Sequence, residues 1–304
     1  MANKKMDELA LMDAMIRREF PKYLKRKARA FKEKQKVLKN FAILSDQLLN
    51  EQKVSELKIE NPPTHPWRPC PAGHCWVRSH PRQVKSTRKN PDGYTMVDGH
   101  CRINPKKKEI IFLDEIEKIS ESHFRDLKLR PCPIDLGFNK KTANGLAFDD
   151  LIAGWTQYWN DIFKPQEPLD PNLVKALIAS ESGFNAKSVI AVSKSKKNMA
   201  RGLMQITDQT LKILNDEKGE LKDHFVKLTK TQVMNPSANI YAGIRWLFHK
   251  KRLASGKLGH EASWMETIAN YKSYLNKKIE NPNEKFKGMD NITRNYGRLK
   301  ECKK

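Results

Sequence analysis

The sequence predicts a mainly α-helical protein that also carries a small β-containing module and an N-terminal helical arm. Apolar residues recur at three- and four-residue steps near the N-terminus and over much of the second half, as one face of a helix requires. Closely spaced prolines at 61–71 end the first helical stretch. Short β-like runs follow, among cysteines and histidines. We therefore expect a basic helical arm at 1–58, an accessory Cys/His module at 59–127, a helical domain at 128–290 and a basic tail at 291–304.

The charge of the chain predicts an anionic partner. The 304 residues carry a net charge of +23, which suits a nucleic acid, an anionic membrane surface or a bacterial cell wall without ranking them. The N-terminus lacks the uninterrupted apolar segment of a secretory signal, and no window is long enough to span a bilayer. We therefore expect no membrane span and no signal-dependent export.

The arm and the module are predicted in some detail. Residues 22–39 carry nine bases against the single acid Glu33, and we favour a solvated helical arm there over a dedicated anion-binding one. In the module, residues 93–97 and 109–113 are the best strand candidates. Residues 114–127 follow a helical pattern, and a loop is expected at 130–133.

The cysteines and histidines of the module allow three readings, which are a structural zinc site, a disulfide, and unlinked buried thiols. Five cysteines are too few and too unevenly spaced for a disulfide scaffold. The spacing is also poor for zinc, and a disulfide would join Cys70 or Cys75 to Cys101. We favour unlinked thiols and expect no metal or cofactor. The weak metal candidates are Cys70, His74, Cys75, His80, His100 and Cys101.

One carboxylate in the helical domain has the setting of a general acid. Asp170 and Pro171 form a well-defined helix start, and Gly183 is placed to end the helix. Glu181 lies three residues after Ile178, so it projects from the apolar face or its border. Burial there penalises the charged form of a carboxyl group, which is what an acid that protonates a leaving oxygen needs. A plain reading, in which Glu181 is exposed and inert, fits most glutamates at helix ends.

Four blocks around Glu181 resemble the SLT-type lytic transglycosylases, in the order found in that family. Residues 177–185 are similar to the helix that carries the family's Glu-Ser pair, and residues 200–205 to its active-site loop. Residues 235–243 resemble its Asn-Pro, Asn-Ile, Gly signature. Residues 268–271 resemble the segment that brings a tyrosine to the catalytic glutamate. The resemblance covers roughly residues 165–280, somewhat over a third of the chain.

The resemblance implies a lysozyme-like helical domain with a saccharide groove that cleaves peptidoglycan. Glu181 would protonate the glycosidic oxygen between N-acetylmuramic acid and N-acetylglucosamine, and would then accept the proton of the muramic acid C6 hydroxyl. Neither a second carboxylate nor a metal or cofactor is required. The residues implied in substrate binding are Ser182, Gly202, Leu203, Met204, Gln205, Asn239, Tyr271 and Lys272.

Two departures from the family pattern are visible. Lys272 stands where the family usually has an asparagine amide, which puts substrate affinity in question more than the reaction. Residues 193–198 lengthen the loop before Gly202, and we favour reading their bases as solvated.

Other readings stay open. A goose-type lysozyme would share the fold and the glutamate but use water, although the Gly-Leu-Met-Gln block and the lack of a nearby second acid favour the lyase. A non-catalytic cell-wall binder, or a nucleic-acid binder using residues 22–39, is the rival from another class, and we rank nucleic acid last. Action in the periplasm or cell wall without a signal peptide suggests a phage lysin, or an antibacterial effector with a secretion apparatus and an immunity protein as partners.

Overall fold

A computed structural model gives the structure of the protein. It describes residues 67–71, 73–88, 90–104, 110–125, 127–136, 145–192, 198–224 and 226–302. All of these fall within one compact unit, residues 63–304. The arm predicted at 1–58 and most of the lengthened loop at 193–198 lie outside the described residues.

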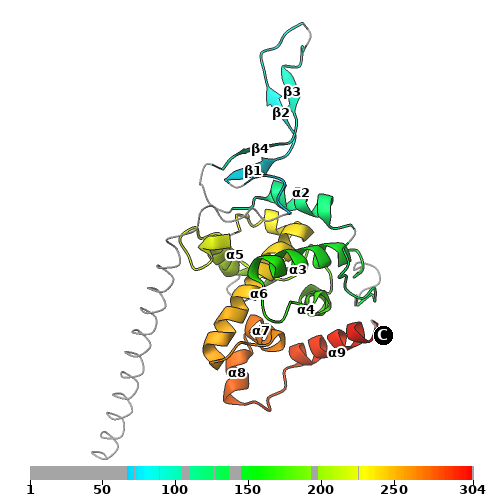
Figure 1. Ribbon diagram of the computed structural model, residues 1–304, viewed down its shortest axis with the longest axis vertical. Helices are drawn as coiled ribbons and strands as arrows, with labels where there is room; N and C mark the ends of the chain where they lie inside the picture. The colour runs from blue at the N-terminus through cyan, green and yellow to red at the C-terminus, as the bar shows by residue number, and fades with distance from the viewer. Residues whose placement is uncertain are drawn as a thin grey trace, which may run out of the picture. The chain divides into compact units, whose positions relative to one another are not determined.

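Helices dominate the described part of the chain, which confirms the mainly α prediction (Figure 1). The strands are β1 (His74–Val77), β2 (His80–Gln83), β3 (Tyr94–Val97), β4 (His100–Ile103), β5 (Val189–Ala191), β6 (Met199–Arg201) and β7 (Ile206–Thr207). The α-helices are α2 (Leu113–His123), α3 (Asp149–Phe163), α4 (Pro171–Ser182), α5 (Asp208–Leu214), α6 (Pro236–Leu258), α7 (Trp264–Tyr271), α8 (Leu275–Glu280) and α9 (Lys287–Glu301). Short 3₁₀ turns lie at Lys222–His224 and Gln232–Met234.

Helix α6 forms the centre of the helical body. It contacts α2, α3 and α7 along its length. Where α3 meets α6, the rings of Trp155, Tyr158 and Tyr241 pack edge to face with centroids 4.7–5.9 Å apart. The buried indole nitrogen of Trp155 has the partner that burial requires, since Nε1 donates to Ser237 Oγ at 2.9 Å. This aromatic core fixes α6 as the support for the site.

The β-containing module is a bent two-stranded ribbon that projects beyond α2 (Figure 1). Strand β1 pairs with β4, and β2 pairs with β3, both antiparallel. Arg68 anchors the base of the ribbon, because its Nε lies 2.7 Å from Glu115 Oε1 of α2 and both side chains are buried. The buried pair therefore holds the ribbon to the helical body.

The local predictions for this module were partly right. The strand predicted at 93–97 is confirmed as β3. The strand predicted at 109–113 is wrong, since Ile111 makes only an isolated bridge to Val226 and Leu113 already begins α2. Ile110 and Ile111 are buried by packing, and a short apolar run does not distinguish such a segment from a strand. The helix predicted at 114–127 is real but ends at His123.

The predicted boundaries of the helix that carries Glu181 are confirmed. Asp170 accepts a hydrogen bond from the backbone N–H of Asn172 at 2.8 Å, and Pro171 occupies the first turn of α4. Gly183 ends the helix in the left-handed conformation, with φ +57°. Asn235 caps α6 with its side chain, which accepts a hydrogen bond from the backbone N–H of Ala238, and Pro236 follows it in the first turn.

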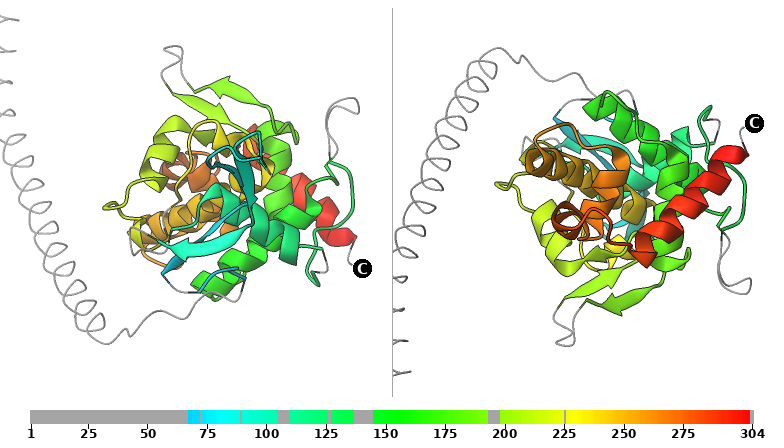
Figure 2. Two further views of the ribbon diagram at one scale, coloured as in Figure 1. Left: turned by 90° about the horizontal axis from the view of Figure 1, so that it is seen from above. Right: turned by 90° about the horizontal axis from the view of Figure 1, so that it is seen from below.

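Two disulfides correct the expectation of unlinked thiols. Cys70 is joined to Cys101, which closes the base of the ribbon, and Cys75 is free and buried. Cys132 is joined to Cys302, 170 residues away. The second bond ties the end of α9 to the segment before α3, and α9 packs along α4 at the edge of the helical body (Figure 2). Spacing could not reveal this pair, because the two cysteines meet only when α9 returns to α4.

Within the described residues, none of the helices combines the length and the apolar character that crossing a bilayer requires.

Candidate functional site

The site begins at the C-terminal end of α4. The apolar face of this helix, including Leu177 and Ile178, is fully buried. Glu181 lies one turn further along α4 on the same side of the helix, and 15% of its side chain is exposed. Ser182 donates a hydrogen bond from its hydroxyl to the carbonyl of Leu203 at 2.8 Å. The end of α4 is thereby tied to the turn between β6 and β7.

This turn, residues 202–205, is held in a backbone conformation that most residues avoid. Gly202 has φ +72°, and a Cβ added there would overlap the side-chain amide of Asn239. Gln205 has φ +51°, and its side-chain nitrogen donates to the carbonyl of Gly202 at 2.7 Å. The turn therefore depends on glycine at 202 and places the Gln205 side chain at the edge of the site.

Asn239 of α6 holds the turn by hydrogen bonds to backbone atoms. It is fully buried. Its oxygen accepts from Met204 N at 2.8 Å, and its nitrogen donates to the carbonyls of Arg201 and Val233 at 3.0 and 2.8 Å. The resemblance implied that Asn239 binds substrate, but every contact that the structure gives its amide is with backbone. Asn239 thus holds the turn in place.

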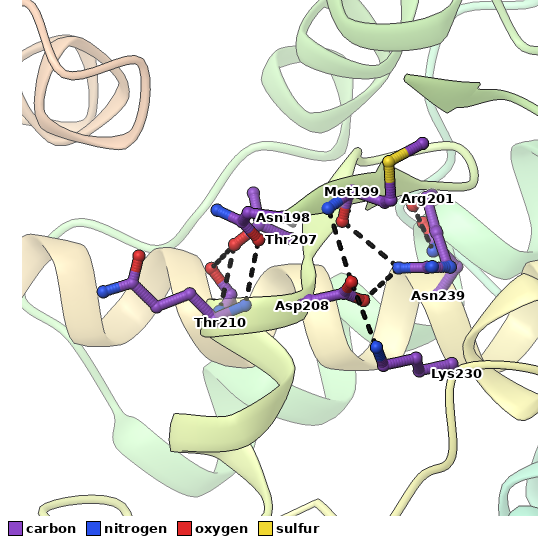
Figure 3. A network of polar contacts seen from close by, with 9 residues as sticks. Asn198, Met199, Arg201, Thr207, Asp208, Thr210, Lys230 and Asn239 are labelled. Carbon is purple, nitrogen blue, oxygen red and sulfur yellow. Dashed lines mark hydrogen bonds and ion pairs between the residues drawn. The ribbon is translucent and has the colours of Figure 1, made fainter. Parts of the chain in front are cut away.

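Asp208 fastens the small sheet to the start of α5. Figure 3 shows its carboxylate between Met199, Arg201 and Lys230. It accepts from Met199 N at 3.4 Å and from Lys230 Nζ at 3.2 Å, and it pairs with Arg201. Burial alone would raise the pKa of Asp208, but these hydrogen bonds and the two cations outweigh it and lower the pKa. Asp208 is therefore a structural anion, engaged away from Glu181.

Lys272 meets Glu181 directly. Its ammonium nitrogen lies 2.6 Å from Glu181 Oε1, and 13% of the lysine side chain is exposed against 15% of the glutamate. The two residues are 91 positions apart in the sequence. The sequence predicted a desolvated Glu181 on an apolar face, and the structure adds an ammonium partner that the spacing of residues around Glu181 could not reveal.

Tyr271 closes the site beside Lys272. Its hydroxyl donates to the carbonyl of Met204 at 2.6 Å. Desolvation of the partly buried phenol, together with the nearby charge of Glu181, raises the pKa of Tyr271 well above its usual value. The phenol therefore stays neutral at ordinary pH and acts as a hydrogen-bond donor.

These side chains surround a cavity of about 620 Å³. Among its described lining residues, Glu181 is the only carboxylate, and Lys250 and Lys272 are the cations. Trp246 and Lys250, one turn apart on α6, form one wall, with the lysine ammonium 5.0 Å from the centroid of the indole ring. The cavity thus combines one acid, two bases and three aromatic side chains, Trp246, Tyr271 and Tyr274.

Only some of the residues implied in substrate binding face this cavity. Gln205, Tyr271 and Lys272 line it together with Glu181. Leu203 and Met204 are fully buried beneath it. The structure therefore separates residues that can touch a ligand from residues that support the turn, which include Ser182, Gly202 and Asn239.

Sequence reasoning missed several lining residues. Trp246 and Lys250 carry a usable signal, since an aromatic residue and a base one turn apart on a helix point to the same side. Asn198 and Tyr274 carry none, because each lies outside the regular elements that a sequence pattern identifies.

The weak metal candidates do not form a metal centre in the described part of the chain. The disulfide between Cys70 and Cys101 leaves neither sulfur as a thiolate. No group of three or more described His, Cys, Asp or Glu side chains is placed to hold a metal ion. His80 and His100 lie near each other, with ring centroids 6.5 Å apart, on the exposed ribbon.

Residues 161–291 match the family model of the transglycosylase SLT domain. The C-terminal half of the chain contains an SLT domain. The match covers less than half of the 304 residues, and it includes every described residue that lines the cavity. Comparisons with curated proteins and with solved structures gave no match.

The SLT domain confirms the predicted family and its place in the chain. The resemblance was expected over roughly 165–280, and the match extends slightly beyond both ends. It runs from the end of α3 into α9, so α4, the sheet β5–β7 and the helices α5 to α8 all belong to it. The ribbon and α2 precede the match and are not accounted for by the family.

Proposed function

We propose that the SLT domain of this protein is a peptidoglycan lytic transglycosylase in which Glu181 acts first as an acid and then as a base. The observation that carries the proposal is that Glu181 is the only carboxylate among the described residues lining the cavity. A hydrolase that uses paired carboxylates would need a second one across the scissile bond. A single carboxylate suits a reaction in which the substrate itself supplies the nucleophile.

The proposed reaction has two steps. The protonated Glu181 gives its proton to the glycosidic oxygen, the bond from C1 of N-acetylmuramic acid to that oxygen breaks, and the oxygen keeps the electron pair. The acetamido oxygen of the same sugar bonds to C1 and carries the positive charge. The Glu181 carboxylate then takes the proton of the C6 hydroxyl while O6 bonds to C1 and displaces the acetamido oxygen. The product is a 1,6-anhydro sugar, and no water is consumed.

The remaining residues of the site have supporting roles in this proposal. Gln205 offers a side-chain amide that can hydrogen-bond to the sugar. Trp246 lines the cavity beside Lys250 and offers an apolar contact to a sugar ring. Ser182 and Asn239 fix the position of the turn 202–205 relative to Glu181, because each makes a hydrogen bond with a backbone atom of that turn.

The disulfides support action outside the cytoplasm. Such bonds persist in oxidising compartments such as the periplasm, and the protein has two of them. The net charge of +23 also suits a polyanionic wall. We propose that the protein reaches the wall either as a phage lysin or as an effector carried by a secretion apparatus. Signal-dependent export of the native protein would contradict both proposals.

The test is digestion of purified peptidoglycan by the wild type and by Glu181→Gln, with the fragments read by mass. Muropeptides lighter by one water than the hydrated forms identify anhydro ends, and we expect them from the wild type only. Glu280→Gln, an exposed change at the end of α8, serves as the matched control and should cleave normally. Hydrated ends would identify a goose-type lysozyme. Wall binding without cleavage by either protein would leave a non-catalytic binder.

A further inference from the structure

Lys250 is a cation of the cavity that has no acid for a partner. The other lining lysine, Lys272, lies 2.6 Å from Glu181 Oε1. Lys250 forms no ion pair with any residue in the described part of the chain, and no carboxylate is among the groups that shift its pKa. The wall that α6 gives to the cavity therefore carries an ammonium that none of the described carboxylates neutralises.

The two residues that follow Lys250 on α6 do have acidic partners. Lys251 Nζ lies 3.0 Å from Glu261 Oε1, and Arg252 Nη2 lies 3.0 Å from Glu220 Oε2. Neither pair lines the cavity, because successive residues of a helix point to different sides. Lys250 is thus the base of this run that faces the cavity, and it is the one that lacks a counter-ion among the described residues.

The position of Lys250 is fixed from two sides. Its backbone carbonyl accepts a hydrogen bond from Asn270 Nδ2 at 2.9 Å, which ties α6 to the end of α7. Its ammonium nitrogen lies 5.0 Å from the centroid of the Trp246 ring, and that ring is only 9% exposed. The contact with the indole attracts a cation but leaves its charge in place. The ammonium is therefore held ready at the wall of the cavity.

The surroundings of Lys250 make its positive charge unfavourable. Burial lowers the pKa of this half-buried lysine, and the positive charge of Lys257 lowers it further. A cation that loses water and gains no counter-ion raises the free energy of the protein. An anion bound in the cavity would offset this cost by forming a charge-assisted hydrogen bond with the ammonium.

We propose that Lys250 binds a carboxylate of the peptide stem of peptidoglycan, so that the cavity selects glycan whose stems carry free carboxylates. The inference rests on the proposed function and deepens it, since it names the part of the substrate that is recognised. The two sugars of the strand are uncharged when the lactyl group is linked to a stem, so the anions of the substrate lie in the stem. The stem is attached to the same muramic acid whose C1 reacts beside Glu181, which brings it to this cavity.

The first test measures binding without turnover. The probe is a muropeptide of N-acetylglucosamine, N-acetylmuramic acid and a four-residue stem, which lacks the bond that the enzyme is proposed to cleave. Calorimetry compares it with the same muropeptide after its stem carboxylates have been converted to amides. We expect the wild type to bind the free acid about tenfold more tightly, as one charge-assisted contact allows. Lys250→Gln should remove this difference, and Lys250→Arg should keep most of it.

Lys212→Gln is the matched control. Lys212 is an exposed lysine of α5 that does not line the cavity, so its replacement removes the same charge and should keep the preference for the free acid. Circular dichroism checks that each variant is folded. Equal affinity of the wild type for the two muropeptides, or a difference that persists in Lys250→Gln, would overturn the inference.

The second test uses cleavage. Peptidoglycan is digested before and after its stem carboxylates are amidated, a change that leaves wall phosphates intact. The ratio of kcat/KM for untreated to amidated strands should fall about tenfold in Lys250→Gln and stay within about twofold in Lys212→Gln. A wild type that slows on neither substrate after amidation would contradict the assignment, and binding to wall phosphate in its place would give Lys250 a different anion. A wild type that prefers the free stem in calorimetry but cleaves no peptidoglycan would retain the carboxylate site and refute the proposed function.

Discussion

The side-chain oxygen of Asn239 accepts a hydrogen bond of 2.8 Å from the backbone N–H of Met204, with both residues buried beneath the candidate site. Through this contact the first turn of α6 determines where the turn at 202–205 lies, and hence where Gln205 stands relative to Glu181. A residue that never faces the cavity thus controls its shape.

Replacement of Asn239 by leucine should therefore impair both stability and activity. The change leaves the Met204 N–H and the carbonyls of Arg201 and Val233 without this buried partner. Because an unsatisfied buried polar group costs about 1–3 kcal/mol, we expect a loss of about 3 kcal/mol or more in the free energy of unfolding. Urea unfolding measures it, with exposed Asn283→Ala as the control. A stable Asn239→Leu with only a raised KM would instead make Asn239 a substrate ligand.

Ser182 and Tyr271 should act together on the same turn. Ser182 donates to the carbonyl of Leu203, and Tyr271 donates to the carbonyl of Met204. Ser182→Ala and Tyr271→Phe should each lose about 1 kcal/mol of stability. Because the two contacts hold adjacent peptides, the double variant should depart from additivity by about 0.5 kcal/mol or more in a double-mutant cycle. Strict additivity would show that the two contacts stabilise the turn independently.

The two disulfides can be tested by counting thiols. Titration of the unfolded but unreduced protein with a thiol reagent should detect one thiol, Cys75, because the other four cysteines are paired. Full reduction should expose all five. Three or more thiols before reduction would contradict the pairing.

Loss of the Cys132–Cys302 bond should weaken the SLT domain. This bond closes a long loop that contains α3 to α9, so the double variant Cys132→Ser/Cys302→Ser should lose about 2–5 kcal/mol and unfold at lower temperature. Calorimetry with and without reductant measures the change. The variant Cys70→Ser/Cys101→Ser is the comparison, since its bond lies at the base of the ribbon, and it should retain more activity on peptidoglycan.

Stability should fall in mild acid because of His224. Burial, followed by the positive charge of Arg245, lowers the pKa of His224 to about 4, while an unfolded histidine titrates near 6.5. Between these values the unfolded state binds the proton and the folded state does not. The contribution of neutral His224 is therefore complete above about pH 6.5 and is lost as the pH falls toward 4, by at most about 3 kcal/mol.

The variant His224→Gln isolates this effect. Its unfolding free energy should vary less steeply than that of the wild type between about pH 4 and about pH 6.5, because glutamine does not titrate. Urea unfolding across this range measures both slopes. Equal slopes would show that His224 binds the proton equally in the folded and the unfolded protein, so that folding does not lower its pKa.

Local signals in the sequence were enough for α4 and its two ends. Asp170 and Pro171 at the start of α4, and Gly183 at its end, act on backbone groups within a few residues of themselves, so their roles follow from position alone. The mainly α class and the SLT family were predicted for the same reason, since helical periodicity and family motifs are properties of contiguous residues. The failed strand at 109–113 marks the limit of this reasoning, because burial of Ile111 is set by distant neighbours.

Tertiary structure alone decided the chemistry around Glu181. The sequence by itself determined which carboxylate stands at the end of α4 and which blocks accompany it. It did not determine that Lys272 would reach that carboxylate across 91 residues, that Asn239 would turn inward to backbone atoms, or that Cys132 would meet Cys302. Each of these contacts arises where separate helices pack together, and a side chain's neighbours across such an interface depend on the whole fold.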